Sequence, residues 1–162
     1  MMRLFIVLSL MFSVLSCKLS TEQELSLSKS ILRMIEARNS GDALSYLNYT
    51  HPAIVKYYTE QGDSALIKKF QEVPRMGSRD DLKREGLIRW GEVYTKSVRQ
   101  KDSILQAKVE IQLYKEYELI DSIAVFYATC FEDELDWIFV NESDYGKSYF
   151  PSNLRLFELE SN

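Results

Sequence analysis

Few residues in this chain carry the side chains that catalysis or metal binding usually needs. The 162 residues include one histidine, His51, and two cysteines, Cys17 and Cys130. One histidine excludes a site built from several imidazoles, and two cysteines exclude a thiolate cage, so we expect no metal and no cofactor. Gly-rich phosphate loops, the GxSxG nucleophile turn and the HExxH zinc motif are absent from the sequence. The sequence therefore offers no catalytic residue set, which favours a protein that is not an enzyme.

His51 and Cys130 both stand in local contexts that favour a structural role. His51 precedes Pro52, which suits the first position of a helix because no amide hydrogen is needed there. We expect the imidazole to cap that helix, and a general base is the less favoured alternative. Cys130 lies in an apolar run beside Ala128 and Phe131, without a neighbouring Lys, Arg or His that would activate its thiol. We expect a small buried side chain and not a reactive thiol.

The N-terminal 17 residues combine a positive charge, an apolar run and a cysteine. Arg3 is followed by the apolar stretch 4–15, which only Ser9 and Ser13 interrupt. A helix of this length is too short for a hydrocarbon core that needs about 20 residues, so we expect a signal peptide and not a membrane span. Residues 14–17, Val-Leu-Ser-Cys, resemble the bacterial lipobox.

The lipobox resemblance implies that the chain is cut before Cys17 and that lipid is attached to the cysteine sulfur. Residues 1–16 would form the signal peptide and residues 17–20 a tether. Two or more acyl chains hold a protein stably at a membrane, so we expect a lipid-anchored protein of the cell envelope. Lys18 stands where an aspartate would imply inner-membrane retention in enteric-type lipoproteins, which favours the outer membrane. The alternatives are an ordinary signal peptide with an incidental Cys17, or a Cys17 that pairs with Cys130.

Composition and charge are ordinary for one globular domain, which we expect to span residues 21–162. The formal net charge is −4, and no basic cluster is longer than Lys68-Lys69. A polyanion would find no docking patch on such a chain, so we expect no nucleic-acid partner.

The first half of the domain shows helical spacing and helix caps. Thr21 and Glu24 have the spacing of a capping box, and residues 39–41 end the helix that follows. Asp42 is suited to cap a second, short helix, and Pro52 to open a third. A further helix is predicted from residue 63 or 64 to 73. The side chains that we expect to point inward from the first three helices are Leu27, Ile31, Met34 and Ile35, then Leu44 and Leu47, then Ile54, Val55 and Tyr58.

The second half shows the spacing of strands. Residues 86–98 predict a first strand, followed by a polar turn over residues 99–103. Apolar and polar residues alternate from Leu105 to Leu113, which predicts a strand with one face on a core. Residues 122–131 are apolar or aromatic on both faces and predict an inner strand, and residues 135–140 predict the last one. Helices followed by consecutive strands indicate an α+β fold, with N-terminal helices packed on a curved antiparallel sheet of about four to five strands.

Several short patterns resemble nuclear-transport-factor-2-like (NTF2-like) secreted proteins. They are Met34-Ile35-Glu36-Ala37, Gly41-Asp42, Leu44, Tyr46-Leu47, Thr50-His51-Pro52, Gly62 with a short amphipathic helix after it, Asp136-Trp137-Ile138-Phe139 and Phe150-Pro151. The resemblance implies a cone, in which a bent sheet wraps the helices and leaves a pocket. Enzymes of this group, such as ketosteroid isomerase and the polyketide cyclases, place a carboxylate inside the cone, often with a tyrosine donor.

The resemblance makes Glu110, Tyr114 and Tyr127 candidates for such groups, although a solvated strand face is the favoured interpretation of Glu110. Aromatic side chains with a polar tip line pockets but also fill cores, and we favour core positions for most of them. The speculative pocket candidates are His51, Tyr58, Trp90, Glu110, Tyr114 and Tyr127. We expect a binding module for a small apolar ligand or an envelope protein. The alternative is a small isomerase-like or cyclase-like enzyme that acts on an apolar molecule.

Overall fold

The predicted α+β architecture is confirmed by the computed structural model, which describes residues 18–65, 69, 88–115, 118–131 and 135–158. In the described residues, helices come first, four strands follow, and two short turns of helix lie near the end. The helices are α1 (Thr21–Ser40), α2 (Ala43–Asn48), α3 (Pro52–Glu60) and α5 (Glu142–Tyr145), with a 3-10 turn η2 (Ser152–Leu154). The strands are β1 (Ile88–Lys101), β2 (Ile104–Lys115), β3 (Glu118–Phe131) and β4 (Ile138–Asn141). Residues 63–65 and Lys69 are helical as predicted, and the rest of the helix predicted up to residue 73 lies outside the described residues.

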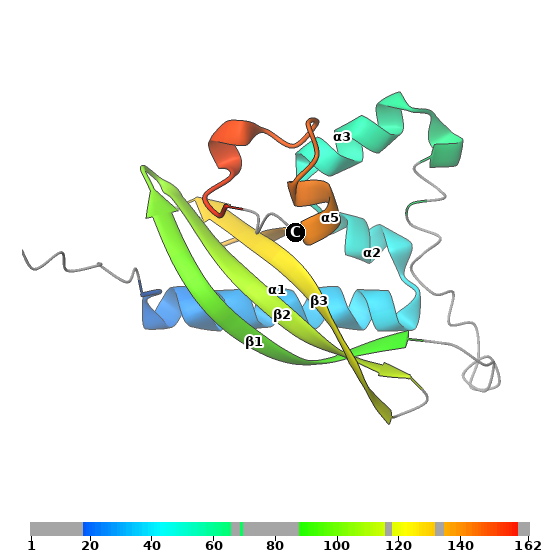
Figure 1. The fold of residues 1–162 in the computed structure, drawn as a ribbon, viewed down its shortest axis with the longest axis horizontal. Coiled ribbons are helices and arrows are strands. Elements are labelled where there is room, and N and C mark those ends of the chain that lie inside the picture. The colour runs from blue at the N-terminus through cyan, green and yellow to red at the C-terminus, as the bar shows by residue number, and fades with distance from the viewer. Residues whose placement is uncertain (1–17, 66–68, 70–87, 116–117, 132–134, 159–162) are drawn as a thin grey trace, which may run out of the picture.

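The four described strands form one antiparallel sheet in the order β1-β2-β3-β4. Register shifts occur twice along β1 and once between Gln112 and Tyr114, and such bulges bend a strand. Figure 1 shows the three long strands bending as they run across α1. The turn between β1 and β2 is shorter than the predicted 99–103, because β1 continues to Lys101. Asp102 takes a φ of 53°, which a tight turn needs.

One face of the sheet packs on α1. Four alternating residues of β2, Leu105, Ala107, Val109 and Ile111, are at most 2% exposed. They pack in a single apolar cluster with the predicted stripe of α1, which is Leu27, Ile31, Met34 and Ile35. Trp137 and Phe139 belong to the same cluster. Both predicted apolar faces are therefore confirmed. Each fully buried side chain of this size stabilises the fold by roughly 1.5–3 kcal/mol.

The inner strand β3 is covered on both faces over residues 126–130, which confirms the prediction there; Ile123 and Phe131, at 50% and 41% exposed, show that it is wrong for the ends of the predicted strand. Five consecutive residues, 126–130, are at most 4% exposed. Phe126, Ala128 and Cys130 join the α1 cluster. Tyr127 joins a second cluster on the opposite face. Its other members come from α3, β4, α5 and the C-terminal segment, and they are Ile54, Val140, Tyr145, Phe150 and Phe157. Cys130 is 1% exposed, so the expectation of a small buried side chain is confirmed.

The capping residue of α1 lies one position earlier than predicted. The Ser20 hydroxyl accepts from the Gln23 amide at 3.2 Å, and the Gln23 side chain accepts from the Ser20 amide at 2.9 Å. The predicted pair Thr21 and Glu24 is therefore wrong, because Ser20 and Gln23 satisfy the same spacing one residue upstream. Gly41, with a φ of 74°, ends the helix where predicted.

The helix α2 differs from the prediction in the face that it buries. Asp42 caps it by accepting from the Ser45 amide at 3.0 Å, as predicted. Leu44, however, is 77% exposed, so the prediction that it points inward is wrong. The six-residue helix turns Tyr46 toward the core instead, where its ring lies edge-on to Trp90 with centroids 6.0 Å apart.

A buried glutamine fastens the C-terminal segment to the sheet. Gln106 lies on the predicted polar face of β2 but is 0% exposed. Its amide nitrogen donates to the Thr129 hydroxyl at 2.8 Å and to the Leu154 carbonyl at 3.0 Å. Its amide oxygen accepts from the Tyr145 hydroxyl at 2.6 Å and from the Leu156 amide at 3.2 Å. Four satisfied hydrogen bonds make this polar residue compatible with complete burial.

Replacing Gln106 with leucine should lower the free energy of unfolding by about 3 kcal/mol, because several buried partners lose their hydrogen bonds. Urea denaturation followed by circular dichroism measures this change. The matched control is Gln112→Leu, on the same strand and face but half-buried, for which we expect a change below about 1 kcal/mol. Equal effects of the two substitutions would contradict the role of Gln106.

Candidate functional site

A cavity of about 320 Å³ lies where the short strand β4 ends. The last pair of β4 with β3 joins Asn141 to Phe126, and the chain then turns away into α5. The cavity opens at that point, beside Ala124 and Val125 of β3, and α1, α2 and α3 supply the other walls. Its apolar lining includes Met34, Ile54, Trp90, Phe126, Phe139 and Val140, and its polar lining includes Arg38, Tyr46, Thr50, Lys69, Glu142 and Asp144. Mostly apolar walls with a few polar groups and a volume of this order are typical of small-ligand sites.

One side of the cavity is built around Trp90. The guanidinium carbon of Arg38 lies 4.5 Å from the centroid of the Trp90 ring, a cation–π geometry. Burial lowers the pKa of Arg38, and the nearby Tyr46 opposes that shift. The Asn39 side chain donates to the Trp90 carbonyl at 2.9 Å and accepts from the Trp90 amide at 3.1 Å. The last turn of α1 thus holds both the backbone and the ring of Trp90 in place.

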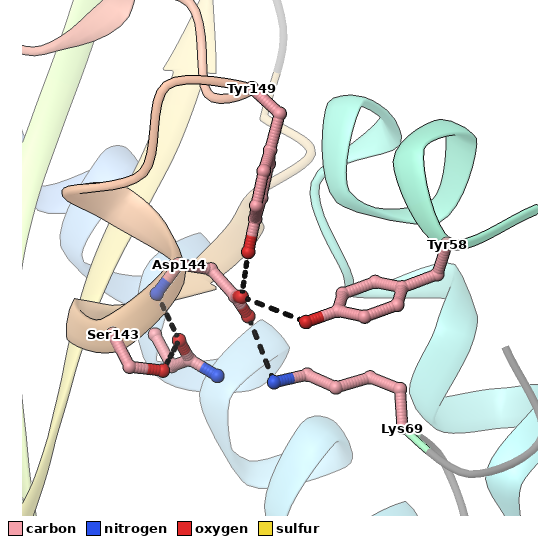
Figure 2. A network of polar contacts seen from close by, with 6 residues as sticks. Tyr58, Lys69, Ser143, Asp144 and Tyr149 are labelled. Atoms are coloured by element: carbon pink, nitrogen blue, oxygen red, sulfur yellow. Dashed lines mark hydrogen bonds and ion pairs between the residues drawn. The ribbon is translucent and has the colours of Figure 1, made fainter. Parts of the chain in front are cut away.

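The other side is built around the carboxylate of Asp144, which is 3% exposed. Figure 2 shows three side chains converging on it. The Tyr149 hydroxyl donates to it, the Tyr58 hydroxyl donates at 3.4 Å, and the Lys69 ammonium lies 3.1 Å from its second oxygen. Burial raises the pKa of Tyr149, and the hydrogen bond to Asp144 raises it further. Because its oxygens already have partners, this carboxylate is a positioned anion more than an available base.

The sequence around Asp144 fixes its backbone. Asn141 caps α5 by accepting from the Asp144 amide at 2.8 Å and from the Ser143 hydroxyl at 2.9 Å. Tyr149 is held in turn by Tyr57, whose ring stacks on it with centroids 3.8 Å apart. Rigid neighbours of this kind preorganise a polar group for a ligand.

His51 lies in the core and not at the cavity. Its side chain is 6% exposed, caps α3 by accepting from the Ala53 amide at 3.2 Å, and meets the Phe150 ring edge-on at 4.9 Å. Its backbone amide donates to the Phe139 carbonyl at 2.8 Å, which ties α3 to β4. Burial lowers the pKa of His51 to about 4. The predicted capping role is confirmed.

The structure does not bring the six pocket candidates together. Trp90 lines the cavity, and Tyr58 reaches Asp144 at its wall. Tyr127 is 2% exposed and stacks on Tyr145 with centroids 3.8 Å apart, so it belongs to the second core cluster.

The remaining two candidates lie elsewhere on the sheet. Glu110 forms an ion pair with Lys96 at 3.2 Å; the Lys96 side chain is 50% exposed and the Glu110 side chain 20%. Glu110 is therefore a partly covered, paired carboxylate, and less solvated than the favoured interpretation expected. The Tyr114 ring occupies the space that a side chain at Gly91 would need, and its hydroxyl donates to Gln112 at 3.3 Å. Neither residue lines the cavity.

Sequence reasoning missed the groups that matter most here, namely Arg38, Lys69, Asp144 and Tyr149. Tyr58 and Asp144 are 86 positions apart, and no local pattern links residues at such a distance. The capping sequence Asn141-Glu142-Ser143-Asp144 was a usable signal for a helix start, because Asn is a preferred N-cap.

Comparison with known proteins adds no family. We found no match between this chain and a protein-family model, a curated protein or a solved structure. Within the described part of the chain, no helix is long and apolar enough to cross a membrane. The same residues contain no group of three or more His, Cys, Asp or Glu side chains that could hold a metal ion. The lipobox and NTF2-like resemblances remain predictions.

Acidification should destabilise the fold through His51. The unfolded imidazole binds a proton near pH 6.5, whereas the folded one does so only near pH 4, so the unfolded state gains protons between these values. Stability is therefore complete above pH 6.5 and falls as the pH drops toward 4, by about 2–3 kcal/mol from this group.

Thermal unfolding between pH 4 and 7 measures this loss, with His51→Asn as the control because asparagine caps a helix without titrating. The slope of stability against pH should be smaller in the variant. Parallel curves for the two proteins would contradict the assignment.

Proposed function

We propose that this protein is a lipid-anchored binding protein of the bacterial cell envelope that holds a small, largely apolar ligand in the cavity beside Asp144. The observation that carries the proposal is the cavity itself, with its apolar walls and its charged groups at two separate places. A ligand would bury its apolar body against Trp90 and Phe126, and its polar end would meet Arg38 or the Lys69–Asp144 pair. The NTF2-like resemblance supports the same arrangement.

The membrane anchor rests on the lipobox resemblance of residues 14–17. Three residues, Lys18 to Ser20, separate Cys17 from the first residue of α1, so the domain would lie close to the bilayer. Lys18 after the cysteine favours the outer membrane.

An enzyme is the second candidate, because a buried carboxylate with tyrosine donors lines the cavity. That arrangement is similar in kind to the cone enzymes. Of its residues Asp144, Tyr58 and Tyr149, only Tyr58 was a pocket candidate from the sequence. The ion pair with Lys69 favours binding, since it keeps the carboxylate occupied.

Replacing Cys17 with serine should release the protein from membranes, because the sulfur that would carry the lipid is lost. Fractionation of cells into membrane and soluble parts, followed by immunoblotting, measures the distribution. Cys130→Ala is the matched control and should stay with the membranes, since Cys130 is buried in the core. A Cys17→Ser protein that stays membrane-bound with unchanged processing would refute the anchor.

Filling the cavity should reduce ligand capture. We expect small molecules to co-purify with the full-length protein from detergent-solubilised envelope, and mass spectrometry identifies both these and any protein partner. Ala124→Phe, at the cavity wall, should reduce their recovery about tenfold by occupying the space. Ser122→Phe, two residues away on β3 and exposed, should leave recovery unchanged.

Equal recovery with both variants would refute the ligand site, and capture of a protein alone would favour an envelope complex instead. Conversion of the captured molecule on incubation with the protein would favour the enzyme.

A further inference from the structure

A second hollow, of about 560 Å³, runs between the first half of α1 and the edge strand β1. Leu27 and Ile31 form its floor and are 2% and 3% exposed. Val93 and Val98 of β1 line the opposite side, and Leu32 stands at the rim with 60% of its surface exposed. This α1–β1 groove shares no lining residue with the cavity beside Asp144.

The α1–β1 groove begins where the described chain begins. Lys18 and Leu19 are among its lining residues, and Cys17 is the next residue toward the N-terminus. One residue spans at most about 3.6 Å, so a group attached to Cys17 is tethered only one residue away from the groove lining. A lipid on Cys17 would therefore start beside the aliphatic side chains of the α1–β1 groove.

We propose that the α1–β1 groove holds one acyl chain of the lipid carried by Cys17, while the remaining acyl chains stay in the bilayer. This proposal rests on the acylation proposed above. Half of the lining residues are aliphatic and offer a strip of apolar contact: Leu19, Leu27, Ile31, Leu32, Val93 and Val98. The other half are polar and line its open side: Lys18, Glu24, Ser28, Thr95, Lys96 and Ser97. The volume is within the usual range for a bound small molecule. Lys18 and Lys96, at the polar parts of the lining, would meet the headgroup region.

Tethering favours this occupant over any free one. A chain that is covalently attached next to its site binds intramolecularly, at an effective concentration of order millimolar for a short linker. A free lipid or an apolar peptide would have to compete with it. The bound chain would also fix the orientation of the domain, with the start of α1 at the bilayer. The cavity beside Asp144 would lie farther away, because Met34 and Arg38, near the end of α1, line it.

Photocrosslinking of the full-length protein in its own membranes tests the proposal. Cells are grown with a palmitic acid analogue that carries a diazirine and an alkyne, the membranes are irradiated, and the purified protein is digested for mass spectrometry. We expect crosslinks from the N-terminal acyl group to peptides that contain residues 27–32 of α1 and residues 93–98 of β1.

Two substitutions on α1 give the matched comparison. Leu32→Glu replaces an aliphatic side chain at the rim with a hydrated carboxylate and should reduce these crosslinks about tenfold, because the acyl chain loses an apolar contact and meets bound water there. Leu25→Glu changes a residue of similar exposure, 56%, that does not line the groove, and should leave the yield unchanged. Thermal unfolding confirms that both variants fold.

The outcomes separate the two proposals. An N-terminal peptide without label would overturn the acylation and this proposal with it. A labelled N-terminal peptide whose crosslinks reach only membrane lipids or other proteins would overturn the groove proposal alone. Equal crosslinking in the two variants would also overturn it.

Discussion

The burial of β3 on both faces is the constraint on which the rest of the structure depends. Phe126, Ala128 and Cys130 need apolar cover on one side, and Tyr127 needs it on the other. The helix α1 can cover one face only, so the chain beyond β4 must return across the other. This return buries Gln106, a polar residue of β2, beneath apolar side chains. The burial is tolerated because Gln106 forms four hydrogen bonds with the groups around it. The C-terminal segment is therefore part of the core and not a tail.

The fold could be predicted from the sequence wherever a periodic pattern met one continuous surface. The alternation from Leu105 to Leu113 and the stripe from Leu27 to Ile35 each report burial against a partner that is uniform along the element. Leu44 shows the limit: in a helix of six residues, spacing cannot tell which face is buried, because the neighbours of the helix decide. Gln106 shows a second limit of prediction from sequence. A polar residue on the polar face of a strand gives no sign that a distant segment will cover it.

The candidate site was harder to predict than the fold, for a related reason. Asp144 is surrounded by Tyr58 from α3, by Lys69 and by Tyr149 from the loop after α5, which come together only when the second face of the sheet is covered. Glu110, which the sequence made conspicuous as a carboxylate in an apolar strand, meets Lys96 instead. A carboxylate can be buried only where several hydrogen-bond donors surround it. Those donors come from distant parts of the sequence, so a local sequence pattern does not show where they meet.

The cavity beside Asp144 and the α1–β1 groove are lined by different turns of the same helix, α1. Leu27 and Ile31 line the groove beside β1, whereas Met34 and Arg38, from the next turns, line the cavity beside Asp144. At a rise of 1.5 Å per residue, Leu27 and Arg38 are separated by about 16 Å along the axis. Because the helix is held to β1 through Asn39 at one end and through Leu27 and Ile31 at the other, both hollows are parts of the same rigid packing. Under the two proposals, a lipid chain and a ligand would therefore occupy neighbouring places on one helix without touching the same side chain, and the anchor would leave the binding cavity unobstructed.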